Sequence, residues 1–272
     1  MRRVPLSSLS TAAPWRAARQ ARPAPLGQRV IPPVLIGAAL MAVSVRGAAQ
    51  DGPPHERDAP QYKLSYGTYF YSDSTIGQDL NLRWERGRTR AWLGHYTDPS
   101  FGPQTRVGMD HTFELAPKLQ VQMSLETATQ QFLGGSIVAA LGHPWFVVAG
   151  LGRTNLKPYY NLSYDPNDSL TAGMGFKVDS DIAIALTVVA DNRLDTGQRV
   201  WHLFGRRRWS DQLRTTVDLN YKQGRGDLGE PVKGWGGSAV FDFDGWFVRI
   251  ARDQKQNFAP VNATRVTLGV RF

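Results

Sequence analysis

The sequence predicts an all-β protein, an antiparallel up-and-down β-barrel that crosses a membrane with its strands. Three observations lead to this prediction. Apolar and polar side chains alternate along segments of about ten residues, the connections between segments are alternately short and long, and aromatic residues gather near the short connections. The composition agrees, because 27 glycines and an aromatic content of 11% are common in β structure.

The first 49 residues differ in composition from the rest of the chain. They contain seven arginines and no acidic residue, followed by an apolar run at 33–45 and by the small residues Gly47 and Ala49. This order predicts a signal peptide at 1–49. A short periplasmic segment at 50–60 and a barrel at 61–272 follow. The alternative, a membrane anchor, needs roughly 18 apolar residues, and the run is shorter.

Most of the net charge belongs to this leader. The whole chain has 32 basic and 23 acidic residues, for a net charge of +9. Without the seven leader arginines, 25 basic residues face 23 acidic ones, so the basic isoelectric point does not indicate nucleic-acid binding. The absence of cysteine fits an exported protein and excludes a thiolate metal site or a cysteine nucleophile.

Alternation with a period of two residues is clearest at 78–85, "QDLNLRWE", where Leu80, Leu82 and Trp84 alternate with polar neighbours. Such a strand has one apolar and one polar face. The same alternation recurs at 105–114, 119–126, 169–178, 212–222 and 264–272. These segments fit either a soluble β-sandwich or a transmembrane barrel, so the connections must decide.

The connections favour the transmembrane barrel. Short ones are expected at 86–88, 115–118, 142–144, 179–181, 207–211 and 244–245. Those that alternate with them are mostly longer, which is typical of outer-membrane barrels with short periplasmic turns. Six short and seven longer connections predict about 14 strands. Twelve is the alternative, because "KPYYNLSYD" at 157–165 is either a strand of its own or an extension of the next strand.

The aromatic residues gather at the short-turn ends of the expected strands, where rings favour the boundary between hydrocarbon and headgroups. They are Trp84, Phe113, Trp145, Phe176, Trp209, Trp246 and the C-terminal Phe272. At Asp244 and Gly245, a two-residue hairpin predicts that Phe243 and Trp246 lie opposite each other on one face.

The chain ends in "VTLGVRF", with Val266, Leu268, Val270 and Phe272 at every second position. An exported, cysteine-free chain with alternating segments and this ending resembles the bacterial outer-membrane β-barrel proteins, in a porin-like architecture over 61–272. The resemblance implies residence in the cell outer membrane, contact with its lipid, and recognition of the C-terminal strand by the barrel-assembly machinery. We expect the last strand to pair with the first, near 62–71, because lipid does not tolerate an open sheet edge.

If the apolar faces contact lipid, the opposite faces line the interior. A charge that faced hydrocarbon would cost roughly 2–4 kcal/mol for Arg or Lys at the midplane. The predicted lumen-lining residues are Asp79, Arg83, Glu85, Arg106, Asp110, Glu114, Glu126, Lys177, Arg214, Asp218, Asp242, Arg249 and Arg265. They either face each other across a water-filled pore or form cross-strand ion pairs that close it, and a structural ion pair is the simpler interpretation of any one of them.

The longest connection, "RTNLKPYYNLSYDPND" at 153–168, is the candidate for a constriction. We predict that it folds over or into the barrel and narrows it; the alternative is an ordinary surface hairpin. The constriction residues are Lys157, Tyr159, Tyr160, Asn161, Asp165, Asn167 and Asp168. "DPND" offers oxygen ligands but lacks the spacing and the glutamate of a calcium loop, so we predict a turn there and neither a metal nor a cofactor.

The predicted function is an outer-membrane pore or solute channel with a charged lumen and a loop constriction. The alternatives are a closed barrel, with a structural or adhesive role or a role in exporting a surface polymer, and a membrane-embedded lipid-modifying enzyme. The histidines form no catalytic constellation. His111 alternates onto the lipid face, His143 lies in a turn, His55 precedes the barrel, and His95 and His202 are expected near loops or facing outward.

Overall fold

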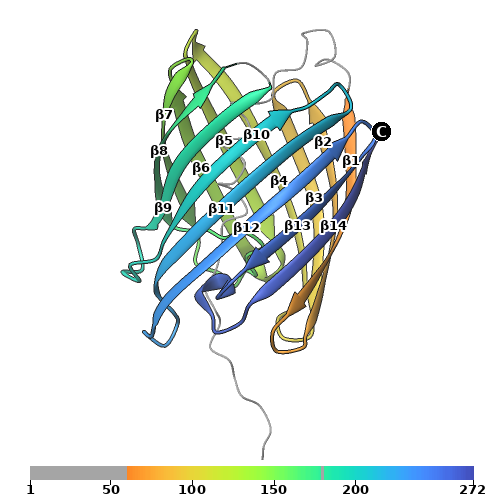
Figure 1. Ribbon diagram of the computed structural model, residues 1–272. Helices are drawn as coiled ribbons and strands as arrows, with labels where there is room; N and C mark the ends of the chain where they lie inside the picture. The colour runs from red at the N-terminus through yellow and green to blue at the C-terminus, as the bar shows by residue number, and fades with distance from the viewer. Residues whose placement is uncertain (1–59, 179–180) are drawn as a thin grey trace, which may run out of the picture. The chain divides into compact units, whose positions relative to one another are not determined.

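The computed structural model describes residues 60–178 and 181–272, which form one closed antiparallel barrel of 14 strands (Figure 1). The prediction of 14 strands is confirmed, and the alternative of 12 is wrong. The signal peptide at 1–49 lies outside the described residues, as do 50–59 of the periplasmic segment. Within the described part of the chain, no helix is long and apolar enough to cross a membrane.

The strands follow one another around the ring in chain order. Their bounds are β1 Gln61–Tyr71, β2 Ile76–Arg86, β3 Thr89–Asp98, β4 Gly102–Ala116, β5 Leu119–Ala128, β6 Phe132–Leu141, β7 Trp145–Thr154, β8 Ser169–Lys177, β9 Ile182–Asp191, β10 Arg199–Arg208, β11 Leu213–Arg225, β12 Pro231–Phe243, β13 Trp246–Asp253 and β14 Ala263–Arg271. Two single-turn 3-10 segments, η1 Thr129–Gln131 and η2 Gln256–Phe258, lie in connections. No strand forms within 157–165, so both strand alternatives for that segment are wrong.

The last strand closes the barrel on the first, as predicted. Leu268 of β14 lies opposite Tyr66 of β1, and the register continues along both strands. Beyond it, Tyr62 and Phe272 exchange two backbone hydrogen bonds of 2.8 and 3.0 Å. Because β1 and β14 pair along their length, the sheet has no open edge.

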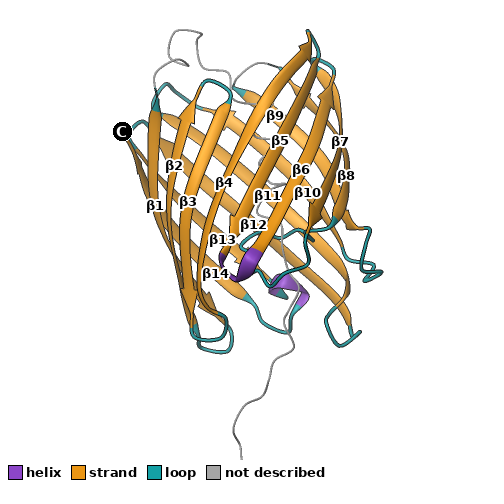
Figure 2. Ribbon diagram, turned by 180° about the vertical axis from the view of Figure 1, so that it is seen from behind, coloured by secondary structure: helices purple, strands orange, loops and turns teal. Residues whose placement is uncertain are grey.

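The alternation in sequence becomes an apolar outer face and a polar inner face. On β4, Val107 and Met109 are about half exposed, whereas Arg106 and Asp110 are 5% and 3% exposed. The same division holds around the ring, whose strands Figure 2 shows from behind. Exposed aliphatic side chains all around a sheet are what a lipid environment requires and what water disfavours.

The short turns lie at the same end of the barrel as the C-terminus (Figure 1). At the hairpin formed by Asp244 and Gly245, the rings of Phe243 and Trp246 stack with their centroids 4.1 Å apart, which confirms the predicted contact. Nearby, Phe272 stacks on Tyr62 at 5.7 Å. We call this end of the barrel the turn end and the opposite end the loop end.

Candidate functional site: the lumen and its inner loop

The connection between β7 and β8, residues 155–168, lies inside the loop end of the barrel, and we call it the inner loop (Figure 2). Tyr159 Oη donates a hydrogen bond of 2.6 Å to Glu126 on β5. Tyr164 Oη donates one of 2.9 Å to the carbonyl of Gly237 on β12. In the ring of 14 strands, β5 and β12 lie on opposite sides. The inner loop therefore reaches both walls of the barrel.

Tyr160 attaches the loop to the wall formed by β1, β3 and β4. Its backbone exchanges two hydrogen bonds with the side-chain amide of Gln104, at 2.7 and 3.0 Å. Its hydroxyl donates to Tyr71 Oη at 2.7 Å, and its ring stacks on Tyr96 at 4.7 Å. The hydroxyls of Tyr71 and Tyr96 are in turn 2.6 Å apart, so three tyrosines on three separate segments form one hydrogen-bonded group.

The inner loop then approaches β10 and β14. Arg265 Nη1 on β14 donates to the carbonyl of Leu162 at 3.5 Å. Asp165 Oδ1 lies 2.7 Å from His202 Nε2, and His202 Nδ1 lies 3.0 Å from Asp218 Oδ1. His202 faces inward and is 7% exposed, so the expectation of an outward or loop position was wrong. His95 does lie on the exposed outer face, as expected.

Four of the predicted constriction residues, Tyr159, Tyr160, Asn161 and Asp165, lie within the barrel. Asn161 folds the loop on itself, because its side-chain amide donates to the carbonyl of Asp165 at 2.7 Å. The other three lie at the base of the loop. Asp168 accepts hydrogen bonds from the backbone and hydroxyl of Thr154, whereas Lys157 is exposed. Asn167 borders a cavity of about 30 Å³, which is room for about one water molecule.

All thirteen predicted lumen residues lie on the inner face of the sheet, because the strand register places each of them on the same face as buried residues such as Arg106, Ala185 and Asn220. Several of them form ion pairs. Arg106 lies 2.7 Å from Asp79, and Arg90 lies 3.0 Å from Asp110. Arg271 lies 2.5 Å from Asp242, and Arg83 lies 3.7 Å from Glu85. Glu114 pairs with Arg88, and Asp218 pairs with His202. Five predicted residues remain. Glu126 accepts hydrogen bonds from Trp92 Nε1 and from Tyr159 Oη, whereas Lys177 and Arg214 lie near the turn end. Arg249 and Arg265 have neutral hydrogen-bond partners.

Arg249 and Arg265 differ from the paired arginines. Among the described residues, no carboxylate oxygen lies within 4.0 Å of either guanidinium. Arg249 Nη2 donates to Ser238 Oγ at 3.4 Å, and Arg265 Nη1 donates to Tyr69 Oη at 2.6 Å. The Nε atom of each is buried and has no hydrogen-bond partner, so the Nη atoms are the ones that a solute can reach. Guanidinium groups without a carboxylate partner keep donors for an anion.

Charged residues on the inner face that could not be predicted from the sequence include Asp98, Arg206, Arg90, Lys222 and Asp253. Arg90 pairs with Asp110, and Lys222 Nζ lies 2.5 Å from Asp253 Oδ1. Lys222 on β11 and Asp253 on β13 are separated by β12, which has Gly234 opposite Lys222 and Gly236 opposite Asp253. No spacing in the sequence indicates this contact. Within the described ranges, no cluster of three or more His, Cys, Asp and Glu side chains could hold a metal ion.

The fold is that of a transmembrane β-barrel of the outer-membrane type. The chain is similar in structure to the Acinetobacter baumannii outer membrane protein Omp33, with a TM-score of 0.51 and 9% identity over 78% of this chain and 98% of that one. A mutant of the Rh. blastica porin gives a TM-score of 0.46 and 12% identity, covering 79% and 99% of the two chains. The KdgM porin in complex with disordered oligogalacturonate gives 0.44 and 8%, covering 77% and 99%. No protein-family model and no curated protein matches the sequence.

Proposed function

We propose that this protein is a passive solute pore of the cell outer membrane and that the inner loop forms its narrowest section. The observation that carries the proposal is the attachment of the loop to opposite walls, through Tyr159 on β5 and through Tyr164 on β12. A segment held across the lumen limits the size of what can pass. The short turns would face the periplasm, and the C-terminal strand would be read by the barrel-assembly machinery.

The inner face supports conduction because it is polar and carries both signs of charge. Water and ions are stabilised by such a lining, and lumen residues set the selectivity of a pore. Arg249 and Arg265, which have no carboxylate partner, favour anions over cations inside the lumen. The expected solutes are therefore small and anionic.

A second candidate is a closed barrel with a structural or adhesive role, or a role in polymer export. The short contacts of Arg106 with Asp79 and of Lys222 with Asp253 favour it, because paired charges fill the interior without requiring water. Catalysis is not expected, since His202, the histidine on the inner face, is held between two carboxylates with no serine in its hydrogen bonds.

Planar-bilayer recording separates the two candidates. The full chain would be expressed, the protein extracted from outer membranes, and its folded state checked by the change in gel mobility on heating. Stable conductance steps with a defined ion preference support the pore. A folded barrel that inserts without conducting would refute the pore and support the closed barrel.

A further inference from the structure

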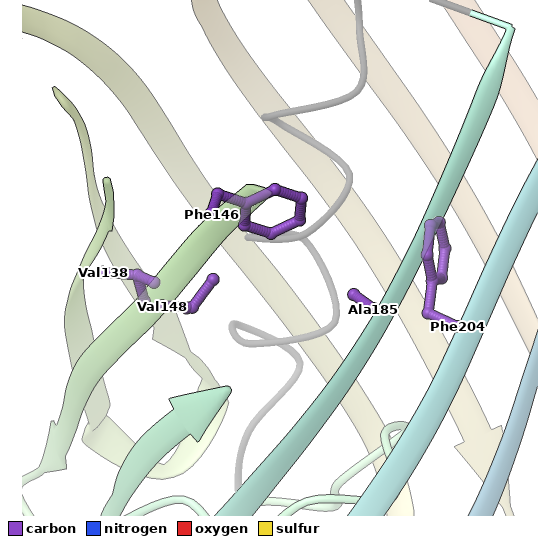
Figure 3. Packing of buried hydrophobic residues seen from close by; sticks show 5 residues of the cluster. All are labelled: Val138, Phe146, Val148, Ala185 and Phe204. Atoms are coloured by element: carbon purple, nitrogen blue, oxygen red, sulfur yellow. The ribbon is translucent and has the colours of Figure 1, made fainter. Parts of the chain in front are cut away.

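The inner face near the turn end carries an apolar patch across β6–β10. It consists of Val138 on β6, Phe146 and Val148 on β7, Ala185 on β9 and Phe204 on β10, and we call it the apolar wall (Figure 3). Phe146, Val148 and Ala185 lie within the first four residues of strands that begin at a short turn. Val138 lies three residues before the end of β6, and Phe204 lies near the middle of β10. Ala185 and Phe204 stand directly opposite each other in the register. An apolar patch on the inner face of a barrel has no lipid to contact.

Glycine on β8 makes this patch continuous. Gly175 lies between Phe146 on β7 and Ala185 on β9 in the register. A Cβ atom on Gly175 would come within 2.3 Å of Phe146 Cζ. The missing side chain therefore lets the ring of Phe146 lie over β8 and join the two halves of the apolar wall.

One cationic group, Arg249, lies on the side of the ring opposite the apolar wall. Counting around the 14 strands places β13 opposite β6 and β14 opposite β7. Strands β7, β9 and β13 all begin at the turn end, and Val148, Ala185 and Arg249 are their respective fourth residues. The three side chains therefore lie at a similar depth from the turn end. The guanidinium of Arg249 donates one hydrogen bond, from Nη2 to Ser238 Oγ, and the side chain is partly exposed, so its remaining Nη hydrogens stay available to an anion.

We propose that this section of the lumen selects small organic anions with an apolar body, that is, aliphatic or aromatic monocarboxylates. The inference rests on the proposed pore function and names the solute class of that pore. Arg249 binds the carboxylate, and the hydrocarbon body lies against Val138, Val148 and Phe204. An anion covered with hydroxyl groups, such as a sugar acid, would lose water at the apolar wall without gaining hydrogen bonds there.

Blockade of ion current tests this selectivity on the full-length protein. Sodium benzoate or sodium gluconate is added to one side of a bilayer in KCl, and the concentration that halves the conductance is measured. Both anions carry one charge, and they differ in the polarity of the body. We expect benzoate to halve the conductance at a concentration roughly ten-fold lower than gluconate does, because the benzoate ring is removed from water when it lies against the apolar wall.

Two variants separate the charge from the apolar surface. Arg249→Gln should weaken blockade by both anions. The double variant Val138→Thr, Val148→Thr keeps the β-branched shape, adds a hydroxyl at each position, and should weaken benzoate blockade several-fold while leaving gluconate unchanged. Val189→Thr, on the same face of β9 but towards the loop end, is the matched control and should have no effect. If the double variant does not fold, Val148→Thr alone replaces it.

The outcomes distinguish this inference from the proposed function. A wild-type protein that does not conduct KCl refutes the pore, and the inference fails with it. A wild-type protein that conducts KCl but responds equally to benzoate and gluconate refutes the inference and leaves the pore intact. Unchanged benzoate blockade in the folded valine variants would also overturn it.

Discussion

His202 on β10 and Asp165 in the inner loop are joined by a contact of 2.7 Å between Nε2 and Oδ1, and both side chains are buried. This contact ties the loop to β10 of the barrel wall, three residues before the loop ends at Asp168. Asp218 holds the other ring nitrogen at 3.0 Å, so the imidazole is fixed in orientation. The position of the loop in the lumen depends on such side-chain contacts, since the loop contains no strand.

Asp165→Asn should therefore loosen the inner loop. Removing one partner of a buried ion pair costs about 3–5 kcal/mol, although Asp218 remains beside His202 and reduces the loss. We expect more frequent transitions between conductance levels in single-channel records, because the loop leaves the wall more often. Asp195→Asn is the control, since Asp195 is exposed in the neighbouring β9–β10 connection. Equally frequent transitions in the two variants would show that the His202 contact does not hold the loop.

Glu126 anchors the other side of the loop. It is 1% exposed and accepts hydrogen bonds from Trp92 Nε1 at 2.7 Å and from Tyr159 Oη at 2.6 Å. Glu126→Gln keeps the size but replaces one acceptor with a donor, so one of these bonds is lost or weakened. We expect a loss of about 1–3 kcal/mol in unfolding free energy, measured by urea titration of the detergent-solubilised barrel. Glu114→Gln, at the exposed end of the neighbouring strand β4, removes a charge from a surface ion pair with Arg88 and provides the reference. An unaltered midpoint for Glu126→Gln would contradict the anchor.

Gly175→Ala tests the close contact between β8 and the ring of Phe146. The added methyl would lie 2.3 Å from Phe146 Cζ and 2.7 Å from the carbonyl oxygen of Ile184, so the ring must move. Overpacking of this kind costs typically 1–3 kcal/mol. We expect the temperature at which the heat-modifiable band is lost to fall. Gly205→Ala on β10 is the matched control, because nothing lies within 4 Å of its Cβ position, and similar losses in both variants would argue against this packing.

The C-terminal Phe272 should affect assembly more than conduction. Its ring stacks on Tyr62 at 5.7 Å, and its backbone completes the pairing of β14 with β1. We expect Phe272→Ala to lower the yield of folded barrel in cells several-fold, because the closing contact and the proposed assembly signal are both weakened. Folded protein is measured by the heat-modifiable band. Trp209→Ala removes another exposed aromatic at the turn end, and a loss of yield as large as that for Phe272→Ala would point to a general aromatic effect.

The strand pattern could be predicted because lipid imposes it on the sequence. On β2, β4 and β5 every second side chain faces hydrocarbon and must be apolar, so the period of two residues is visible without coordinates. Strand β10 follows the same geometry, but Val200 and Phe204 are apolar on its inner face while Trp201 and Leu203 are apolar on its outer face. With both faces apolar, the alternation disappears, and the inward direction of His202 could not be predicted.

The path of the inner loop was even less accessible to prediction. Tyr160 contacts Gln104, which lies 56 residues earlier, and Tyr71, which lies 89 residues earlier. Such contacts form when the barrel closes, and no local spacing encodes them. The length of the connection and its tyrosines indicated that it was unusual. They did not indicate which walls it reaches.

The central claim is that the inner loop narrows an open pore, and removing the loop tests it most directly. Residues 156–166 would be replaced by a two-residue linker; Thr154 and Asp168 are already hydrogen-bonded to each other, so the shortened connection can close with β7 and β8 in place. We expect the shortened protein to form a folded barrel with a clearly larger single-channel conductance than the wild type. A folded variant with unchanged conductance would contradict it.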